Sequence, residues 1–215
     1  MSITQLTPIL MPQKIEPLLA QDLLSIFHRF LRDDKWQNML EDGRRAVRAQ
    51  VFKAFFGGHL RAVAELKNRW EYGLGDYSLV VIQRNRQKFI LDFENIMRDY
   101  ATGLAAAPAV ENRLKTLAQV CVWTLYNEGK LSSYRQRSQG RVGLEPFTAQ
   151  VSEFMPMPLS KYSVIWVAQM DELIKPCVIC SERNGKKFPL YGPLPEIPAH
   201  PHCRCEWGYE ELSRG

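Results

Sequence analysis

The segment "KPCVICSERNGKKFPLYGPLPEIPAHPHCRCEWGY", residues 175–209, determines what kind of C-terminal unit this chain can form. Four of the chain's five cysteines stand there in two pairs, one with C-x-x-C and one with C-x-C spacing, and a histidine precedes the second pair by three residues. Two thiolates at C-x-x-C spacing can reach one ion from a tight turn, and structural zinc takes four such ligands in a tetrahedron. The candidate metal ligands are Cys177, Cys180, His200, Cys203 and Cys205.

The segment holds more donors than a tetrahedral site needs, so the ligand set stays open at this stage. We expect the C-x-x-C pair to bind the ion, with two of His200, Cys203 and Cys205 completing the set. If residues 203–205 are extended, the two sulfurs lie on one face and Arg204 points away from them. The prolines between the two pairs stiffen the return path and limit the unfolded alternatives of a segment with little core of its own.

The cysteines have three alternative interpretations: disulfide bonds, a redox-active C-x-x-C motif or a catalytic zinc site. Disulfides need an oxidising compartment, whereas the start "MSITQLTPILMPQKIEPLL" lacks the charge cluster and apolar run of a secretory signal. A thioredoxin-like motif needs a surrounding βαβ pattern that is missing, and catalytic zinc needs an open position beside an acid or base. We therefore expect a reducing cytosol, a structural Zn²⁺ and, since no apolar stretch could span a bilayer, no membrane partner.

Positive charge is concentrated outside the cysteine-rich segment. The 215 residues carry a formal net charge of +5, but residues 150–215 hold seven Lys or Arg against eight Asp or Glu. A basic surplus favours contact with nucleic acid or another anionic surface, although a solvated helical surface has the same composition. The segment "KLSSYRQRSQGR", residues 130–141, is either a hydrated helix end or a surface along phosphates. The candidate nucleic-acid-binding residues are Lys130, Arg135, Arg137 and Arg141.

Apolar residues recur at spacings of three and four through the first two thirds of the chain, the pattern of helices with one buried stripe. This pattern predicts helices over residues 15–31, 77–104 and 110–138. A further apolar pattern over residues 46–55 stops at Gly57 and Gly58, so we expect an interruption there. Cys121 lies within the apolar spacing of the last helix, which predicts a buried small hydrophobe rather than a nucleophile.

The composition changes after the last of these helices. Residues 140–160 contain two glycines and three prolines and lose the helical periodicity, which indicates a boundary. Beyond it, "YSVIWVAQM" and "CRCEWGY" are typical of strands, and Asn184-Gly185 is typical of a hairpin turn. The predicted fold is α+β and mostly α, with a helical body over residues 1–140, a linker over 141–162 and a zinc-stapled β-hairpin unit over 163–215.

The order of these C-terminal features resembles the phage head morphogenesis family, the minor head proteins of Mu type. The shared order is a strand with tryptophan, C-x-x-C, a glycine turn followed by lysine and an aromatic residue, a proline-rich return and H-P-x-C-R-C. The matching residues are Trp166, Cys177, Cys180, Gly185, Phe188, Pro198, His200, Pro201, Cys203, Arg204 and Cys205. The resemblance covers residues 163–207 and, more loosely, the segment "SSYRQRS" before them. His202 stands where the family usually has a small polar residue.

The resemblance implies a low-copy component of the virion head, made in the host cytoplasm and incorporated with the portal during procapsid assembly. Portal, capsid or scaffold proteins would be its partners, and it would assist head assembly, DNA packaging or DNA delivery. Some members of the family are thought to bind double-stranded DNA without sequence preference. Because the sequence offers no convincing catalytic set, we expect a protein that is not an enzyme.

Two other classes fit part of the pattern. A metal-dependent nuclease of the His-Asn-His kind also carries C-x-x-C with later His and Cys residues, but it needs a histidine base and a separate divalent ion. His200 is already among the expected zinc ligands. In a zinc-ribbon DNA-binding module, the metal-binding unit should carry a net positive charge. Residues 150–215 instead contain one more acidic than basic residue.

Overall fold

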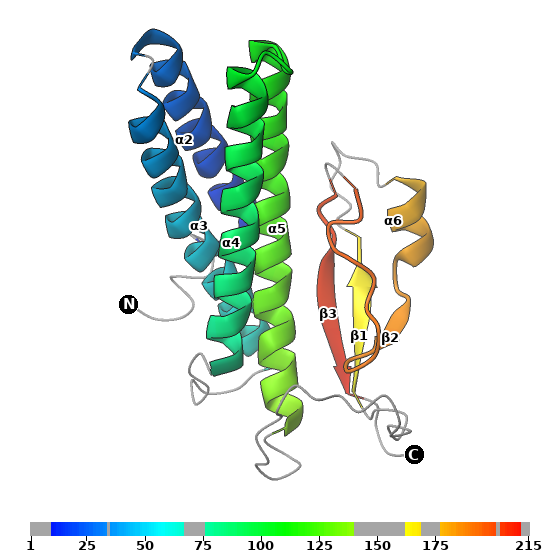
Figure 1. Ribbon diagram of the computed structural model, residues 1–215. Coiled ribbons are helices and arrows are strands. Elements are labelled where there is room, and N and C mark those ends of the chain that lie inside the picture. The colour runs from blue at the N-terminus through cyan, green and yellow to red at the C-terminus, as the bar shows by residue number, and fades with distance from the viewer. Residues whose placement is uncertain are drawn as a thin grey trace.

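The computed structural model describes residues 10–33, 35–66, 76–139, 162–168, 177–200 and 203–211. Four long helices lie side by side, and a small sheet lies next to the last of them (Figure 1). The helical body consists of α2 (Pro12–Asp33), α3 (Trp36–Glu65), α4 (Asp76–Ala101) and α5 (Ala107–Gln139). The sheet unit consists of β1 (Tyr162–Val167), α6 (Val178–Arg183), β2 (Lys187–Pro189) and β3 (Glu206–Glu211). The predicted fold class, mostly helical with a small C-terminal β unit, is confirmed.

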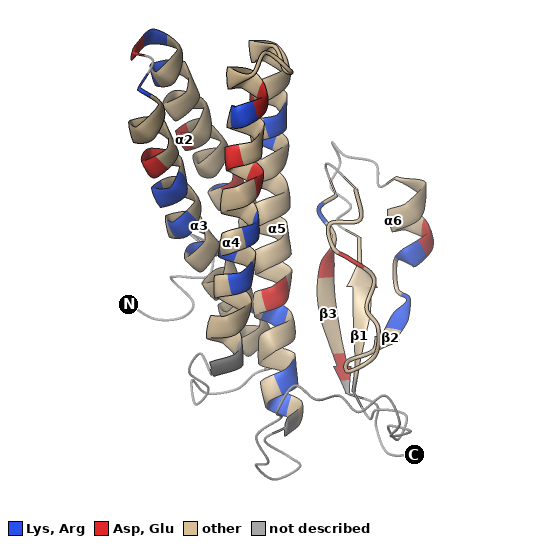
Figure 2. Ribbon diagram, in the orientation of Figure 1, with Lys and Arg blue, Asp and Glu red and all other residues tan. Residues whose placement is uncertain are grey.

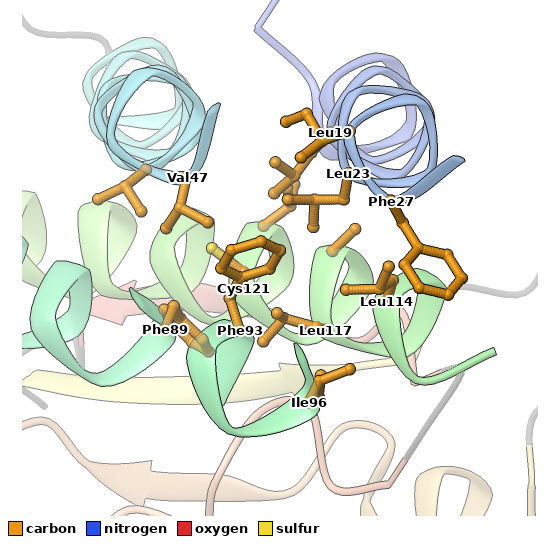
Figure 3. Close-up of a cluster of buried hydrophobic side chains, with 14 of the residues drawn as sticks. Leu19, Leu23, Phe27, Val47, Phe89, Phe93, Ile96, Leu114, Leu117 and Cys121 are labelled. Atoms are coloured by element: carbon orange, nitrogen blue, oxygen red, sulfur yellow. The ribbon is translucent and has the colours of Figure 1, made fainter. Parts of the chain in front are cut away.

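The helical body closes around one hydrophobic core, as the three-and-four spacing predicted. Figure 3 shows side chains from all four helices converging there. The labelled residues are Leu19, Leu23, Phe27, Val47, Phe89, Phe93, Ile96, Leu114, Leu117 and Cys121. Each fully buried aliphatic or aromatic side chain stabilises the fold by about 1.5–3 kcal/mol relative to exposure. Cys121 is fully buried, and burial raises the pKa of its thiol far above the ordinary range, so its predicted role as a small hydrophobe is confirmed.

Helix α3 does not break at its glycine pair, which corrects the sequence prediction. The helix runs without interruption from Trp36 to Glu65. A Cβ at Gly58 would overlap the carbonyl oxygen of Tyr126 on α5, and a Cβ at Gly129 would overlap the carbonyl oxygen of Phe55 on α3. The two helices therefore cross at backbone contact distance through facing glycines. Because glycine has no side chain, the two helices can pack at this distance. The packing compensates for the low helix propensity of glycine.

The sheet has its first strand in the centre, in the order β2-β1-β3, with both neighbours antiparallel to β1. Trp166 on β1 stands opposite Trp207 on β3, and their rings form an edge-to-face pair 5.6 Å apart. Asn184-Gly185 does form a turn, with Gly185 at a positive φ of 75°. The turn lies in the connection between β1 and β2, which pair antiparallel as a hairpin does. The short helix α6, which precedes the turn in this connection, was missed.

A second buried cluster joins the sheet unit to the helical body. Its helical members include Ala62, Leu131 and Tyr134, and its sheet members include Trp166 and Trp207. Residues 130–138 were expected to be a hydrated helix end or a phosphate-binding surface. Instead this part of α5 is largely buried under the sheet unit, where it forms half of the interface.

Two further predictions concern the layout of the chain. The linker over residues 141–162 lies almost wholly outside the described residues, so the domain boundary stays a prediction. Among the described helices, none combines the length and the apolar composition that a bilayer-spanning segment requires.

Candidate metal centre

The C-x-x-C pair lies at the start of α6. Cys177 is the N-cap residue of this helix, and its sulfur accepts a hydrogen bond from the backbone N–H of Cys180 at 3.4 Å. The carbonyl oxygen of Cys177 also accepts from the N–H of Ser181 at 2.9 Å. One turn of helix thus brings both thiols to the same side. The tight turn expected from the spacing is confirmed, in the form of a helical first turn.

The second set of donors precedes β3. The backbone N–H of Cys203 donates to the carbonyl oxygen of His200 at 3.1 Å, which folds the histidine back toward the cysteines. Cys203 and Cys205 belong to the same group of potential ligands. The guanidinium of Arg204 lies on the other side, 3.8 Å from a carboxylate oxygen of Glu16 on α2. This alternation is the one expected of an extended segment.

The structure brings all five predicted donors into one cluster made of two overlapping groups. The first group is Cys177, Cys180 and His200, and the second is Cys180, Cys203 and Cys205. Within each group the ligand atoms lie within 4.8 Å of one another. Cys180 belongs to both groups and is therefore the centre of the cluster. His202 lies outside the described residues.

The spacing of two cluster sulfurs fits a tetrahedral ion. The sulfurs of Cys180 and Cys203 are 3.7 Å apart. Two thiolates bound to one zinc at about 2.3 Å lie about 3.8 Å apart in a tetrahedron. His200 Nε2 lies 2.8 Å from the sulfur of Cys177 and 3.2 Å from that of Cys180. A tetrahedral zinc would hold this nitrogen about 3.5 Å from each sulfur, so the imidazole must move outward by a few tenths of an ångström to bind the ion.

Burial and mutual hydrogen bonds shift the ionisation of the cluster thiols. Burial raises the pKa of the Cys180 thiol to about 12. The hydrogen bond between Cys203 and Cys205 lowers the pKa of the Cys203 thiol and raises that of Cys205. A bound divalent cation stabilises thiolates and offsets the cost of burying them. The cluster can therefore hold a metal ion.

The five cysteines are free thiols. The 3.7 Å between the sulfurs of Cys180 and Cys203 is well beyond the length of an S–S bond, about 2.05 Å. The disulfide framework considered from the sequence is therefore not formed in this structure.

Polar side chains of α5 hold the ligand segment from behind, and the sequence analysis missed them. Asn127 donates to the carbonyl oxygen of Cys205 at 3.1 Å and accepts from the N–H of Trp207 at 2.9 Å. The hydroxyl oxygen of Tyr134 lies 3.2 Å from the carbonyl oxygen of Trp207. Gln119 reaches the carbonyl oxygen of Cys203 at 3.5 Å. The available signal was polar residues recurring at helical spacing within a region that is otherwise apolar.

Lys130 belongs to this interface, which corrects its predicted role. Its side chain is 1% exposed, and its ammonium lies 3.0 Å from a carboxylate oxygen of Glu65 and 3.1 Å from one of Glu206. The hydroxyl of Tyr134 donates to the other oxygen of Glu65 at 2.5 Å. A buried ammonium held by two carboxylates cannot face the phosphates of a nucleic acid. Lys130 instead links α3, α5 and β3.

The other predicted nucleic-acid-binding residues have different positions. Arg135 and Arg137 are half-buried near the C-terminal end of α5, where the helix passes the sheet unit. Arg141 lies outside the described residues. The four predicted cations therefore do not form one exposed row, and Arg135 and Arg137 stay candidates for contact with an anion.

The function of this centre has to be inferred from its geometry and from the order of the sequence motifs. No protein-family model matches this chain, and neither a curated protein nor a solved structure is significantly similar to it.

Proposed function

We propose that the ion is Zn²⁺ and that its role is structural. The donor types support this proposal, because soft thiolates with an imidazole select zinc among the common divalent ions. Three of the donors, Cys180, Cys203 and Cys205, are at most 3% exposed. The ion would join the start of α6 to the segment before β3, and α5 would hold that segment in place through Asn127. The single observation that carries the proposal is the convergence of five donors from two segments in two groups that share Cys180.

We further propose that the protein is a minor head protein of a tailed phage. The support is the order of motifs in residues 163–207, from the strand tryptophan to H-P-x-C-R-C. In this role the zinc unit and the helical body form a rigid piece that associates with portal, capsid or scaffold protein and assists head assembly, DNA packaging or DNA delivery. Its place would be the virion head, after assembly in the host cytoplasm.

The nuclease alternative requires a histidine that is available as a base. The Nε2 atom of His200 lies within hydrogen-bonding distance of two cluster sulfurs. This position favours a ligand role for His200 over a catalytic one, and it is the reason why we propose a protein that is not an enzyme.

Elemental analysis tests the zinc proposal directly. Protein purified under reducing conditions should hold about one tightly bound zinc per chain, and a chelator should increase the number of thiols that react. Replacing Cys180 with Ser should abolish binding, because this residue belongs to both donor groups. Full reactivity of the thiols without a chelator, and no metal, would contradict the proposal.

The head-protein proposal is tested separately, by coexpression with the portal protein of the same phage and copurification of the complex. The wild-type chain should remain bound through size-exclusion chromatography, and the zinc-deficient Cys180→Ser chain should bind less. Zinc-loaded protein that binds neither portal nor procapsid would overturn the assignment and leave the zinc site standing.

A further inference from the structure

A cleft of about 410 Å³ lies between α4, α5 and the loop that leads to the metal ligands. Its volume falls in the range of about 300–1,000 Å³ that is typical of small-molecule sites. One wall is the loop segment from Leu194 to Pro198, and Trp207 and Leu131 also line it. The opposite wall carries basic residues of the helical body. Figure 2 shows basic positions along α4 and at the C-terminal end of α5.

Three cations line the cleft. Arg84 and Lys88 are one helical turn apart on the exposed side of α4, and Arg135 comes from α5. Within the described part of the chain, neither Arg84 nor Lys88 has a carboxylate within 4.0 Å, although the ammonium of Lys88 lies 5.5 Å from the ring centre of Phe89. Neither side chain is held in a short ion pair by the described residues, so both can turn toward a ligand.

Two carboxylates also line the cleft. Glu128 is half-buried, and although its burial raises the pKa of its carboxyl, Arg135 and Arg84 both act to lower that pKa. The three groups therefore lie close enough to interact. Glu196 is exposed on the loop, where water screens its charge. Three cations against two carboxylates leave an excess of one positive charge among the lining residues, which favours an anionic ligand.

We propose that this cleft binds a small organic phosphate. The phosphate group lies against Arg84, Lys88 and Arg135, and the organic part packs against the proline-rich wall from Leu194 to Pro198. Guanidinium groups suit this task because they bind phosphate oxygens through two parallel hydrogen bonds. The inference does not depend on the phage assignment. It depends on the metal only in that the loop wall ends two residues before His200.

Calorimetric titration of the full-length, metal-loaded chain tests the proposal with three probes: inorganic phosphate, adenosine monophosphate and adenosine. The monophosphate should bind more tightly than phosphate, because it also fills the apolar side, and adenosine should show no measurable binding. Replacing Arg84 with Gln should weaken binding of the monophosphate by about tenfold or more, since a charged hydrogen-bonding partner is lost. Lys88→Gln should act in the same direction.

Arg86→Gln is the matched control, because it removes the same charge from the same helix at a position that does not line the cleft. Its affinity for the monophosphate should equal that of the wild type. Equal weakening by Arg84→Gln and Arg86→Gln would reduce the effect to general electrostatics and overturn the proposal. Binding of adenosine as tight as that of the monophosphate, or no binding of any probe at millimolar concentration, would overturn it as well. Metal content measured on each variant separates these outcomes from a failure of the zinc site.

Discussion

The buried ammonium of Lys130 is the most consequential single group outside the metal cluster. It lies between Glu65 at the end of α3 and Glu206, the residue that directly follows the last cysteine donor. Glu206 is itself 8% exposed. The ammonium of Lys130 and the carboxylate of Glu206 are removed from water and stabilise each other only when both are present, because each alone would carry its desolvation cost, whereas the side chain of Glu65 stays 29% exposed. Lys130 therefore adds an ionic link to the hydrogen bonds through which Asn127 holds β3 on the helical body.

Replacing Lys130 with Met should lower the free energy of unfolding by about 3–5 kcal/mol, the usual cost of leaving a buried charge without its partner. Urea unfolding followed by circular dichroism measures the change. Lys115→Met is the control, since it removes an exposed lysine from the same helix and should change stability by no more than about 0.5 kcal/mol.

The double variant Lys130→Met/Glu206→Gln adds a second check. It should be more stable than Lys130→Met alone, because the uncompensated carboxylate is gone. If the Lys130→Met variant unfolds at the same urea concentration as the wild type, the ammonium does not stabilise the interface between the sheet unit and the helical body.

At the scale of elements, the structure rests on the close crossing of α3 and α5. Facing glycines at 58 and 129 let the two backbones touch, and side chains packed on either side complete the core. The sequence predicted the apolar stripes of these helices, because the spacing of Val47, Leu114 and their neighbours is set by helix geometry. The predicted break at the glycine pair was wrong. Glycine favours a break in a solvated helix, whereas in a packed helix it permits close contact with a neighbouring helix.

The same reasoning explains what was predicted of the sheet unit and what was missed. The donors follow from cysteine spacing and the central strand β1 from its β-branched and aromatic composition, which are local signals. Helix α6 is only six residues long and takes its stability from the Cys177 cap and from packing, so helical periodicity could not reveal it. The anchoring role of Asn127 and Lys130 arises from segments far apart in the chain, and no local pattern reports such a contact.

Gly58→Ala should destabilise the protein, although alanine favours a helix by about 1 kcal/mol over glycine. The new methyl group would overlap the backbone of Tyr126, which cannot move without moving α5. We expect a net loss of about 1–3 kcal/mol, measured by thermal or urea unfolding.

Gly43→Ala provides the comparison, because its methyl group would meet the far end of the Phe93 ring instead of a backbone atom. A ring can turn or shift, so this variant should lose less stability than Gly58→Ala. Equal losses, or a gain at position 58, would show that the helix crossing is looser than described.

At the scale of the whole molecule, two cores of unequal strength share α5. The core of the helical body contains side chains from four long helices, whereas the second core depends on the sheet unit and on the α5 residues beneath it. Trp166, Trp207 and Tyr134 are its largest buried side chains. A three-stranded sheet of this size contributes little free energy of folding by itself. In small units of this kind, binding of a structural ion contributes the further free energy that folding needs.

Removing the metal with a chelator should therefore unfold the sheet unit first. Amide hydrogen exchange should show lost protection over residues 162–211 and over the α5 segment beneath them, while α2 and α4 keep theirs. Cys180→Ser should show the same pattern without chelator and no further change when chelator is added. Equal loss of protection in α2 would mean that the molecule unfolds as a single cooperative unit.

The central position of β1 also has a consequence for how fast the chain folds. Because β1 comes first in sequence and both partners come later, each ladder joins distant residues, such as Ile165 with Lys187 and Tyr162 with Glu211. Closing these loops costs conformational entropy before the strand contacts can stabilise the pairing. Helices, by contrast, grow from local contacts. We expect the helices to form early and the ion to be captured late. A chain halted between these stages would expose the face of α5 and the unpaired edges of β1, a surface on which association with other chains competes with folding.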